Sequence, residues 1–193
     1  INASKWSIVT EIAARIVSPV TNMILARIIT PEAFGVVATV TMVVSFAAMF
    51  TDAGFNKYLV QHEFKGESEK LANANVAFWT NIGISALLWL LITAFREQIA
   101  FLVGSPGLGN VIAIACLELL LSSFSSIQTA LYRRDFDFRT LFIVRLISVS
   151  IPFMITIPLA LLGVSYWSII IGSLTIQLSN AVILTAKSKW KPR

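Results

Sequence analysis

The sequence predicts an all-α integral membrane protein, a bundle of six transmembrane helices, and three observations support this. Of its 193 residues, 56% are hydrophobic and only 13% are charged, whereas a soluble domain has roughly 45–50% and 25%. The apolar residues lie in six runs of about 20 residues, the length that a helix needs to cross a bilayer. The runs do not alternate, and they are about twice as long as transmembrane β-strands, so a barrel is not expected.

The six predicted helices follow one another with short polar connectors between them. They cover residues 6–29, 34–59, 72–95, 107–132, 140–161 and 166–186. The first run exceeds signal-peptide length and no small-residue cleavage site follows it, so we expect it to be retained, with a bend at Pro19. Gly104, Gly107 and Gly109 are interpreted as an external turn, because a phosphate-binding loop would need a preceding strand and a following Lys-Ser/Thr pair.

The basic residues separate between the two sides of this predicted bundle. Only Arg27 and Arg96 fall in the connectors of one side. The other side receives eleven of the 15 basic residues, namely Lys5, Lys57, Lys65, Lys70, Arg133, Arg134, Arg139, Lys187, Lys189, Lys191 and Arg193. This asymmetry predicts that both termini are cytoplasmic. It also explains the net charge of +5 by orientation and contact with anionic lipid, without nucleic acid as a partner.

Residues for catalysis or metal binding are scarce. The single histidine, His62, lies in a predicted cytoplasmic loop, and the single cysteine, Cys116, lies inside the fourth predicted helix. Neither has a second ligand or a nucleophile-base partner nearby in the sequence. We therefore expect no enzymatic activity, no cofactor and no bound metal.

Polar residues inside the predicted spans are the main functional signal, because such residues are costly in lipid. In the first helix Glu11, Arg15, Ser18 and Asn22 follow the spacing i, i+4, i+7, i+11 and so share one face. Arg15 lies nine residues past Trp6, about 14 Å deeper, near the middle of the hydrocarbon layer. An intrahelical pair with Glu11 would reduce the cost of burying it.

Similar polar stripes recur in four other predicted helices. They consist of Thr41, Ser45 and Asp52; Glu118, Ser122, Ser125 and Thr129; Arg145 and Thr156, with Pro152 between them; and Ser173, Gln177 and Asn180. For the hydroxyl and amide residues, hydrogen bonds between helices and a hydrated cavity explain the pattern equally well. For Arg15, Glu118 and Arg145 a hydrated interior is favoured. An ion pair between Glu118 and Arg145 that only fixes helix packing is the alternative.

Four segments carry a family resemblance, in the right order and covering nearly the whole chain. They are 25–35 (LARIITPEAFG), 50–61 with FTDAGF and LVQ, 131–139 (LYRRDFDFR) and 163–168 (GVSYWS). Together they resemble bacterial polysaccharide exporters, the Wzx-like O-antigen and exopolysaccharide flippases. That superfamily also contains multidrug extruders and the lipid II flippase.

The resemblance implies a transporter in the bacterial inner membrane that moves an undecaprenyl-diphosphate-linked oligosaccharide to the outer leaflet. Its members have two six-helix lobes around a central cavity, so these residues correspond to one lobe, the N-terminal one. The expected partner is a second lobe or another copy of the chain. The candidate cavity residues are Glu11, Arg15, Asn22, Arg27, Asp52, Glu118 and Arg145, with Arg15 and Arg145 for the diphosphate and Arg27 at the outer mouth.

Two other functions stay open. A drug or cation antiporter of the same superfamily would need an acidic cavity, for which Asp52 and Glu118 are the candidates. A membrane-embedded glycan or acyl transferase would need an interfacial histidine or paired carboxylates, and neither is evident.

Overall fold

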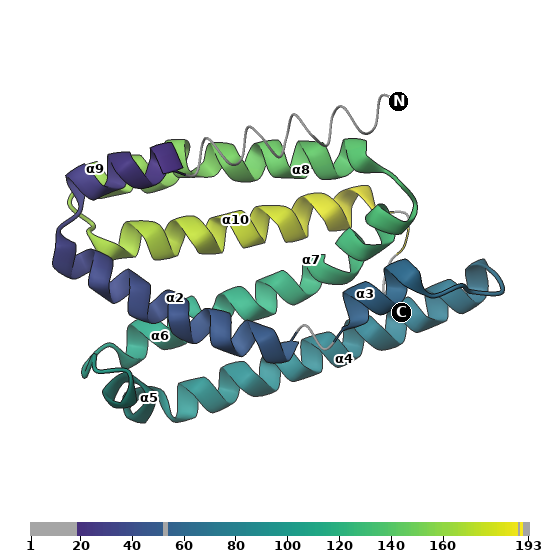
Figure 1. The fold of residues 1–193 in the computed structure, drawn as a ribbon, viewed down its shortest axis with the longest axis horizontal. Coiled ribbons are helices and arrows are strands. Elements are labelled where there is room, and N and C mark those ends of the chain that lie inside the picture. Colours follow the sequence, from purple (N-terminus) through teal and green to yellow (C-terminus); the bar gives the residue numbers. More distant parts are fainter. Residues whose placement is uncertain (1–18, 52–53, 189, 191–193) are drawn as a thin grey trace.

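The structure, a computed structural model, describes residues 19–51, 54–188 and 190. Within these residues it contains helices and turns but no strand, as Figure 1 shows. Five segments are long and apolar enough to cross a membrane, namely Pro31–Thr51, Glu67–Ala94, Gly109–Arg134, Phe138–Leu161 and Tyr166–Lys187. They correspond to five of the six predicted helices and confirm the all-α membrane class. The remaining predicted helix, 6–29, is the first in the chain. Its residues 6–18 lie outside the described residues, and its residues 19–28 are helical.

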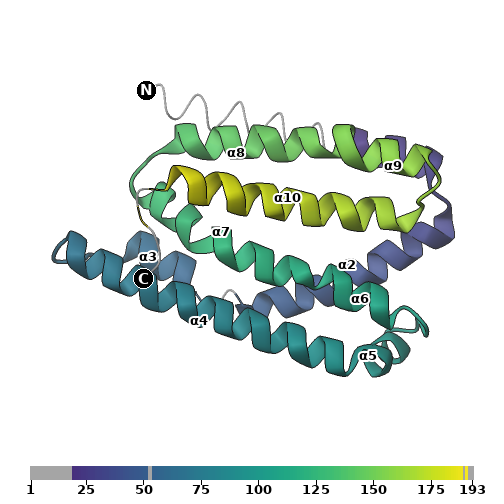
Figure 2. The same ribbon diagram turned by 180° about the vertical axis from the view of Figure 1, so that it is seen from behind.

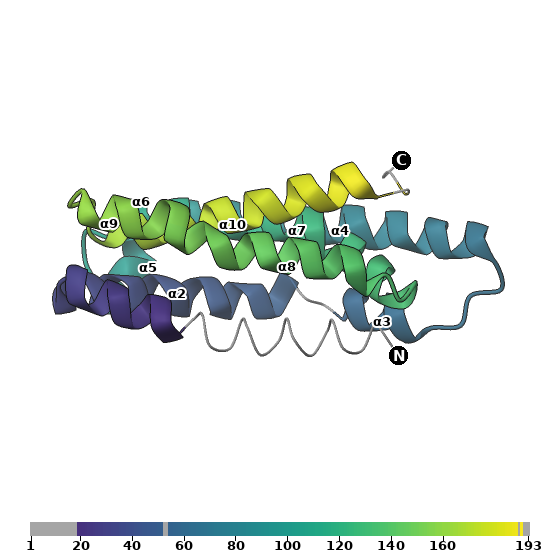
Figure 3. The ribbon, with the colours of Figure 1, turned by 90° about the horizontal axis from the view of Figure 1, so that it is seen from above.

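Three long helical segments lie side by side along the bundle, as Figures 1 and 2 show. They are α7 (Leu117–Arg134), the continuous column α8 (Phe138–Ile151), η1 (Pro152–Thr156) and α9 (Ile157–Leu161), and α10 (Tyr166–Lys187). Helix α4 (Glu67–Ala94) runs alongside α7, whereas α2 (Pro31–Thr51) crosses α7 obliquely. Seen from above, α2 lies below the layer of α4, α7 and α10 (Figure 3). Helix α7 contacts α2, α4, α8 and α10 and is therefore the central element.

The second predicted helix, 34–59, is wrong as a continuous element. Helix α2 ends at Thr51, and a separate short helix, α3 (Phe55–Gln61), begins after Gly54. Gly54 has a φ of 82°, a left-handed conformation that ends helices and favours glycine. Helix α3 instead packs on α7, where the Asn56 amide donates a hydrogen bond of 2.8 Å to Ser126 Oγ.

The other predicted spans differ from the structure mainly at their ends and at two breaks. Helix α4 begins at Glu67, where acidic residues favour the helix N-terminus. The span predicted at 107–132 divides at Cys116 into α6 (Gly109–Ala115) and α7. The span predicted at 140–161 contains the π-helical segment η1, which begins at Pro152 because proline lacks the N–H that would continue the α-helix.

The glycine-rich segment after α4 is a turn, in agreement with the prediction, and a helix that was not predicted precedes it. This helix is α5 (Arg96–Leu102). Gly104 and Gly107 have positive φ angles of 73° and 88°, whereas Gly109 is the first residue of α6.

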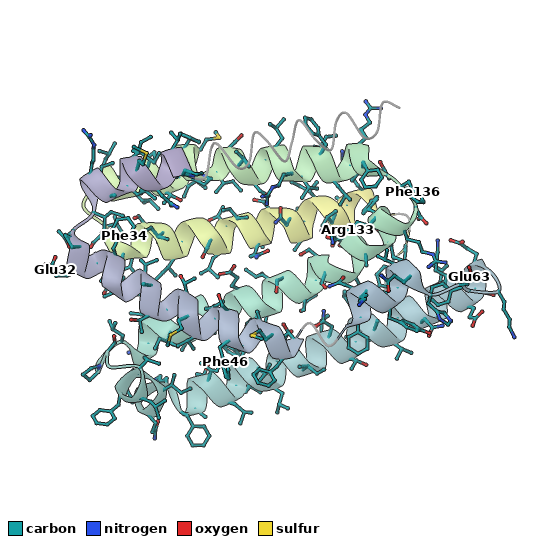
Figure 4. All side chains as sticks on the ribbon, viewed as in Figure 1. Glu32, Phe34, Phe46, Glu63, Arg133 and Phe136 are labelled. Atoms are coloured by element: carbon teal, nitrogen blue, oxygen red, sulfur yellow. The ribbon has the colours of Figure 1, made fainter. Side chains whose placement is uncertain are left out.

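The connectors gather at two ends of the bundle. Figure 4 labels Glu63, Arg133 and Phe136 at one end of the bundle, which is called the basic end. Most of the described lysines and arginines of the connectors and helix termini lie at this end. The opposite end holds Glu32 and Phe34. An apolar cluster fills the bundle toward the opposite end and includes Val40, Ile112, Cys116, Leu119 and Ile170. A second apolar cluster, nearer the basic end, includes Leu59, Ala74, Ile127 and Ala130 and packs α3 and α4 against α7.

Candidate functional site

A cavity of about 520 Å³ lies between α7, α8 and α10. Its lining comes from the last turns of α7, the first turns of α8 and the C-terminal half of α10, so it lies in the half of the bundle nearer the basic end. The described residues that line it are Ser125, Thr129, Arg133, Phe138, Leu141, Phe142, Val144, Arg145, Ser148, Asn180 and Leu184.

The charged side chains among the described lining residues of this cavity are all positive. Two guanidinium groups, Arg133 from α7 and Arg145 from α8, contribute to its lining, and no carboxylate does so among the described lining residues. Both arginines are exposed. Arginine stays charged at all physiological pH values and presents a planar set of donors that matches carboxylate and phosphate oxygens. The cavity is therefore suited to an anionic ligand.

Hydroxyl and amide side chains complete the polar part of the lining. The Ser148 hydroxyl of α8 lies 2.7 Å from Asn180 Oδ1 of α10 and 2.9 Å from Val144 O, and it can donate to either. Ser125 donates to Ser122 O at 3.1 Å and Thr129 to Ser125 O at 2.8 Å, both within α7. The α7 hydroxyls are thus satisfied by their own helix, while the Ser148–Asn180 bond links two helices.

Four predicted stripe residues meet in this cavity, namely Ser125, Thr129, Arg145 and Asn180. Glu118, by contrast, does not line it. Its Oε1 accepts a hydrogen bond of 3.1 Å from Gln177 Nε2 of α10. The ion pair between Glu118 and Arg145, both of which the structure describes, is absent from the described ion pairs. This alternative interpretation is therefore wrong, and the two charged residues have separate surroundings.

The remaining predicted site residues are not brought to the cavity among the residues that the structure describes. Asn22 and Arg27 are exposed on the helical stretch 19–28 and do not line the cavity. Glu11, Arg15 and Asp52 lie outside the described residues, so their assignment stays a prediction.

Polar side chains of the spans, both within and outside the predicted stripes, also join helices. Besides the Gln177–Glu118 bond, Gln128 Nε2 of α7 donates to Thr185 Oγ1 of α10 at 3.0 Å. Gln128 is almost completely buried, at 2% exposure. For these residues the interpretation as hydrogen bonds between helices is the better one, whereas Arg145 and Asn180 fit the cavity interpretation.

Among the polar residues that line the cavity, sequence reasoning does not identify Arg133 and Ser148. Arg133 was assigned only to a basic loop, and Ser148 was left out of the fifth stripe although it follows Arg145 by three residues and so shares its face. The neighbouring Arg134 points elsewhere. Its Nη1 donates to Leu59 O at 2.8 Å and His62 O at 2.6 Å, and its guanidinium lies 4.6 Å from the ring centroid of Phe64.

Metal ligands are not clustered in the described part of the chain, where no group of three or more His, Cys, Asp or Glu side chains could hold a metal ion. Cys116 is a free, buried thiol within the apolar cluster. The lining of the cavity offers hydrogen-bond donors and positive charge.

A family model described as polysaccharide biosynthesis protein matches residues 24–193. The chain belongs to this polysaccharide biosynthesis protein family. The family match covers every element that lines the cavity, and it agrees with the sequence resemblance to polysaccharide exporters.

Three curated relatives extend this result. The chain is 33% identical to the succinoglycan biosynthesis transport protein ExoT of Rhizobium meliloti over 190 residues, which are 97% of this chain and 37% of the relative. It is 22% identical to an uncharacterized membrane protein in the cps region of Klebsiella pneumoniae, over 96% of this chain and 37% of the relative. It is 20% identical to the lipopolysaccharide biosynthesis protein WzxC of Escherichia coli, over 96% of this chain and 36% of the relative.

The chain thus spans little more than a third of the length of the curated relatives that it matches. No solved structure matches it. As a member of the polysaccharide biosynthesis protein family with five described helical segments of membrane-spanning length, it is a multi-pass membrane protein.

Proposed function

We propose that the protein to which this chain contributes moves an undecaprenyl-diphosphate-linked oligosaccharide from the inner to the outer leaflet of the bacterial cytoplasmic membrane. The observation that carries the proposal is the cavity between α7, α8 and α10, in which Arg133 and Arg145 contribute two positive charges and the described lining contributes no carboxylate. The family membership and the transport relative support the substrate class.

The chemistry of the cavity fits a diphosphate group. Two diphosphate oxygens can bind one guanidinium in a bidentate way, and such charge-assisted hydrogen bonds are roughly twice as strong as neutral ones. Ser148 and Asn180 lie in the same lining and can offer hydrogen bonds of either polarity. Arg145 is the side chain to which we assign the contact with the diphosphate, because it lies on a membrane-spanning segment, seven residues after the N-terminal residue of α8.

We assign the described helices to one lobe of the transporter. The cavity has walls from three helices, and its other wall would come from a second lobe, either in the same polypeptide or in another copy. In transporters built from repeats the substrate site lies between two such halves, and one half alone does not complete it. The share of about a third that the chain covers in its relatives agrees with this assignment.

The basic end faces the cytoplasm in this proposal, and both termini lie on that side. The described residues Lys57, Lys65, Arg133, Arg134 and Arg139 lie at that end, whereas the opposite end has Arg27 and Arg96. Cytoplasmic loops carry such an excess of lysine and arginine. The cavity would then accept its substrate from the leaflet in which it is made.

A chimera tests the function. This chain would replace the matching third of the Rhizobium meliloti succinoglycan transport protein, in a strain that lacks the native protein. We expect the chimera to restore export of succinoglycan to the medium. Absence of export by a chimera that is present in the membrane in normal amounts would contradict the proposed function.

Variants of Arg145 in the same chimera test the role of the cavity. We expect Arg145→Ala to abolish export without changing membrane insertion, and Arg145→Lys to restore only part of it, because lysine keeps the charge and loses the bidentate geometry. Arg96→Ala is the matched control, since Arg96 is an exposed arginine at the opposite end. Export at the level of the unmodified chimera from Arg145→Ala would show that this arginine does not bind the substrate.

A further inference from the structure

The turn between α7 and α8 has an unusual residue at its centre. Phe136 has a φ of 55°, a left-handed conformation that bulky side chains rarely adopt and that favours glycine or asparagine. Hydrogen bonds of the turn hold the backbone in place, from Phe136 N to Arg133 O at 3.3 Å and from Asp137 N to Tyr132 O at 3.0 Å. The conformation is therefore imposed by the fold, and glycine would fit it better than phenylalanine.

Packing within the described chain does not explain the phenylalanine. Its side chain is 76% exposed and points away from the bundle at the basic end, as Figure 4 shows. Its ring contact is an edge-on arrangement with Phe138, at 6.0 Å between centroids. A large apolar side chain that is disfavoured by its backbone and contributes little to the core indicates a contact outside the protein.

The depth of the turn indicates what this contact is. The segment Gly109–Arg134 has 26 residues and is therefore about 39 Å long at 1.5 Å per residue. This exceeds the hydrocarbon core of about 30 Å and comes close to the 40–45 Å that include the headgroups. The turn that follows Arg134 consequently lies at the level of the headgroups, where aromatic side chains are enriched.

The charges of the turn favour an anionic surface. Arg133 and Arg139 are exposed on either side of Phe136. The two acidic residues of the turn are engaged within the protein, since Asp135 pairs with Lys70 at 3.3 Å and Asp137 accepts from Thr140 N at 3.1 Å and Thr140 Oγ1 at 2.8 Å. With three arginines and two aspartates, the segment 133–139 has a net charge of +1, and basic charge near a membrane surface attracts anionic lipids.

We propose that Phe136 inserts into the headgroup region of the leaflet at the basic end, with Arg139 in contact with anionic phospholipid headgroups. This lipid contact fixes the turn that connects α7 to α8, the two helices that carry the cavity arginines. It is a separate property from substrate transport, because it requires only the bilayer and the turn.

Tryptophan fluorescence tests the insertion. The chain with Phe136→Trp would be reconstituted into vesicles that contain brominated phosphatidylglycerol, which quenches only tryptophans that lie among lipids. Glu63→Trp is the matched control, because Glu63 is exposed in another connector at the basic end and both variants keep the same native tryptophans. We expect the fluorescence added at position 136 to be quenched several-fold more by the lipid than that added at position 63, and less by aqueous acrylamide.

Two outcomes would overturn the proposal. One is equal quenching by acrylamide at positions 136 and 63, which would place Phe136 in water. The other is quenching by lipid that appears only when a lipid-linked oligosaccharide is added, which would make the turn a substrate contact. Replacing Arg139 with Gln in the Phe136→Trp chain should reduce quenching by brominated phosphatidylglycerol more than by brominated phosphatidylcholine, and equal reduction would overturn the anionic partner.

A second readout keeps Phe136 in place. An environment-sensitive fluorophore would be attached to Arg139→Cys in a Cys116→Ala background, so that it reports on the turn. We expect a blue-shifted emission in anionic vesicles that Phe136→Ser reverses. An emission that Phe136→Ser leaves unchanged would show that the phenylalanine does not anchor the turn.

Discussion

The half of the bundle near the basic end and the half near the opposite end are built from the same helices but from different residues. Toward the opposite end, Ile112, Cys116 and Leu119 are at most 1% exposed, and Gly172 of α10 approaches Thr156 of η1 so closely that a Cβ would overlap Thr156 Oγ1. Toward the basic end a second apolar cluster packs α3 and α4 against α7, but polar and apolar side chains of α7, α8 and α10 surround a cavity of about 520 Å³.

The difference has a physical explanation in the side chains of α7, α8 and α10. Small residues let helix backbones approach, and helix association in lipid depends on such packing. Polar side chains that are satisfied within their own helix, such as Thr129 on Ser125 O, do not require a close neighbour. The helices α8 and α10 are therefore in close contact toward the opposite end, and a cavity lies between them and α7 toward the basic end.

The largest expected effect comes from the contact between α10 and η1. Gly172→Leu should force the two segments apart, because the added side chain would occupy the position of Thr156. Extra methylenes in a packed core cost about 1–3 kcal/mol, and Gly172→Leu adds a whole side chain where even its Cβ would overlap Thr156 Oγ1. We therefore expect a larger loss of folded protein than from any other variant, measured by size-exclusion chromatography in detergent and by the midpoint of thermal unfolding.

A control and a rescue make this result specific. Gly83→Ala in α4 should be neutral or slightly stabilising, because no atom lies within 4 Å of a Cβ at that position and alanine favours helices. Gly172→Ala should be milder than Gly172→Leu and should be partly rescued by Thr156→Ala. Normal folding of Gly172→Leu would mean that the two helices are not held at this distance.

The next largest effect is a loss of unfolding free energy, expected when a leucine of the apolar cluster is truncated and compared with a leucine of the cavity lining. Leu119→Ala leaves a void in the apolar cluster, and truncation of a buried leucine costs about 2–5 kcal/mol. Leu141 lines the cavity and is only half-buried, so Leu141→Ala should lower the free energy of unfolding by less than about 1 kcal/mol, since the removed atoms already face open space. Equal destabilisation, measured by unfolding in mixed micelles, would contradict the contrast between a packed and an open half.

Sequence periodicity and charge predict most of the membrane-spanning helices and the separation of basic residues, because the bilayer imposes a length of about 20 apolar residues on every span. They also identify Arg145 as a candidate cavity residue. They do not predict that α2 stops at Thr51, because a single glycine such as Gly54 is tolerated within many helices. Nor do they predict that Glu118 pairs with Gln177 instead of Arg145, because that choice depends on how α7 and α10 are rotated against each other.

A smaller effect separates the two neighbouring arginines of α7. Arg134→Lys should loosen the segment 59–64, because lysine loses the fork that reaches the carbonyls of Leu59 and His62 and the stacking on Phe64. Hydrogen bonds to charged groups contribute roughly 1.5–3 kcal/mol, so amide exchange in this segment should accelerate by about tenfold or more. Arg133→Lys is the matched control and should leave exchange in 59–64 unchanged. Equal acceleration by both variants would show that the effect does not come from the contacts that are specific to Arg134.

The smallest effect concerns the hydrogen bond that crosses the cavity. Ser148→Ala removes the 2.7 Å contact with Asn180 Oδ1, and bonds of this kind between membrane helices average about 0.6 kcal/mol. Ser150→Ala is the control on the same helix, because the exposed Ser150 donates only to Leu146 O within α8. We therefore expect a small but measurable fall in unfolding free energy for Ser148→Ala and none for Ser150→Ala. If Ser148→Ala destabilised the protein as much as Leu119→Ala, the cavity half would depend on polar contacts for its stability, and its open packing would not be a property of the fold.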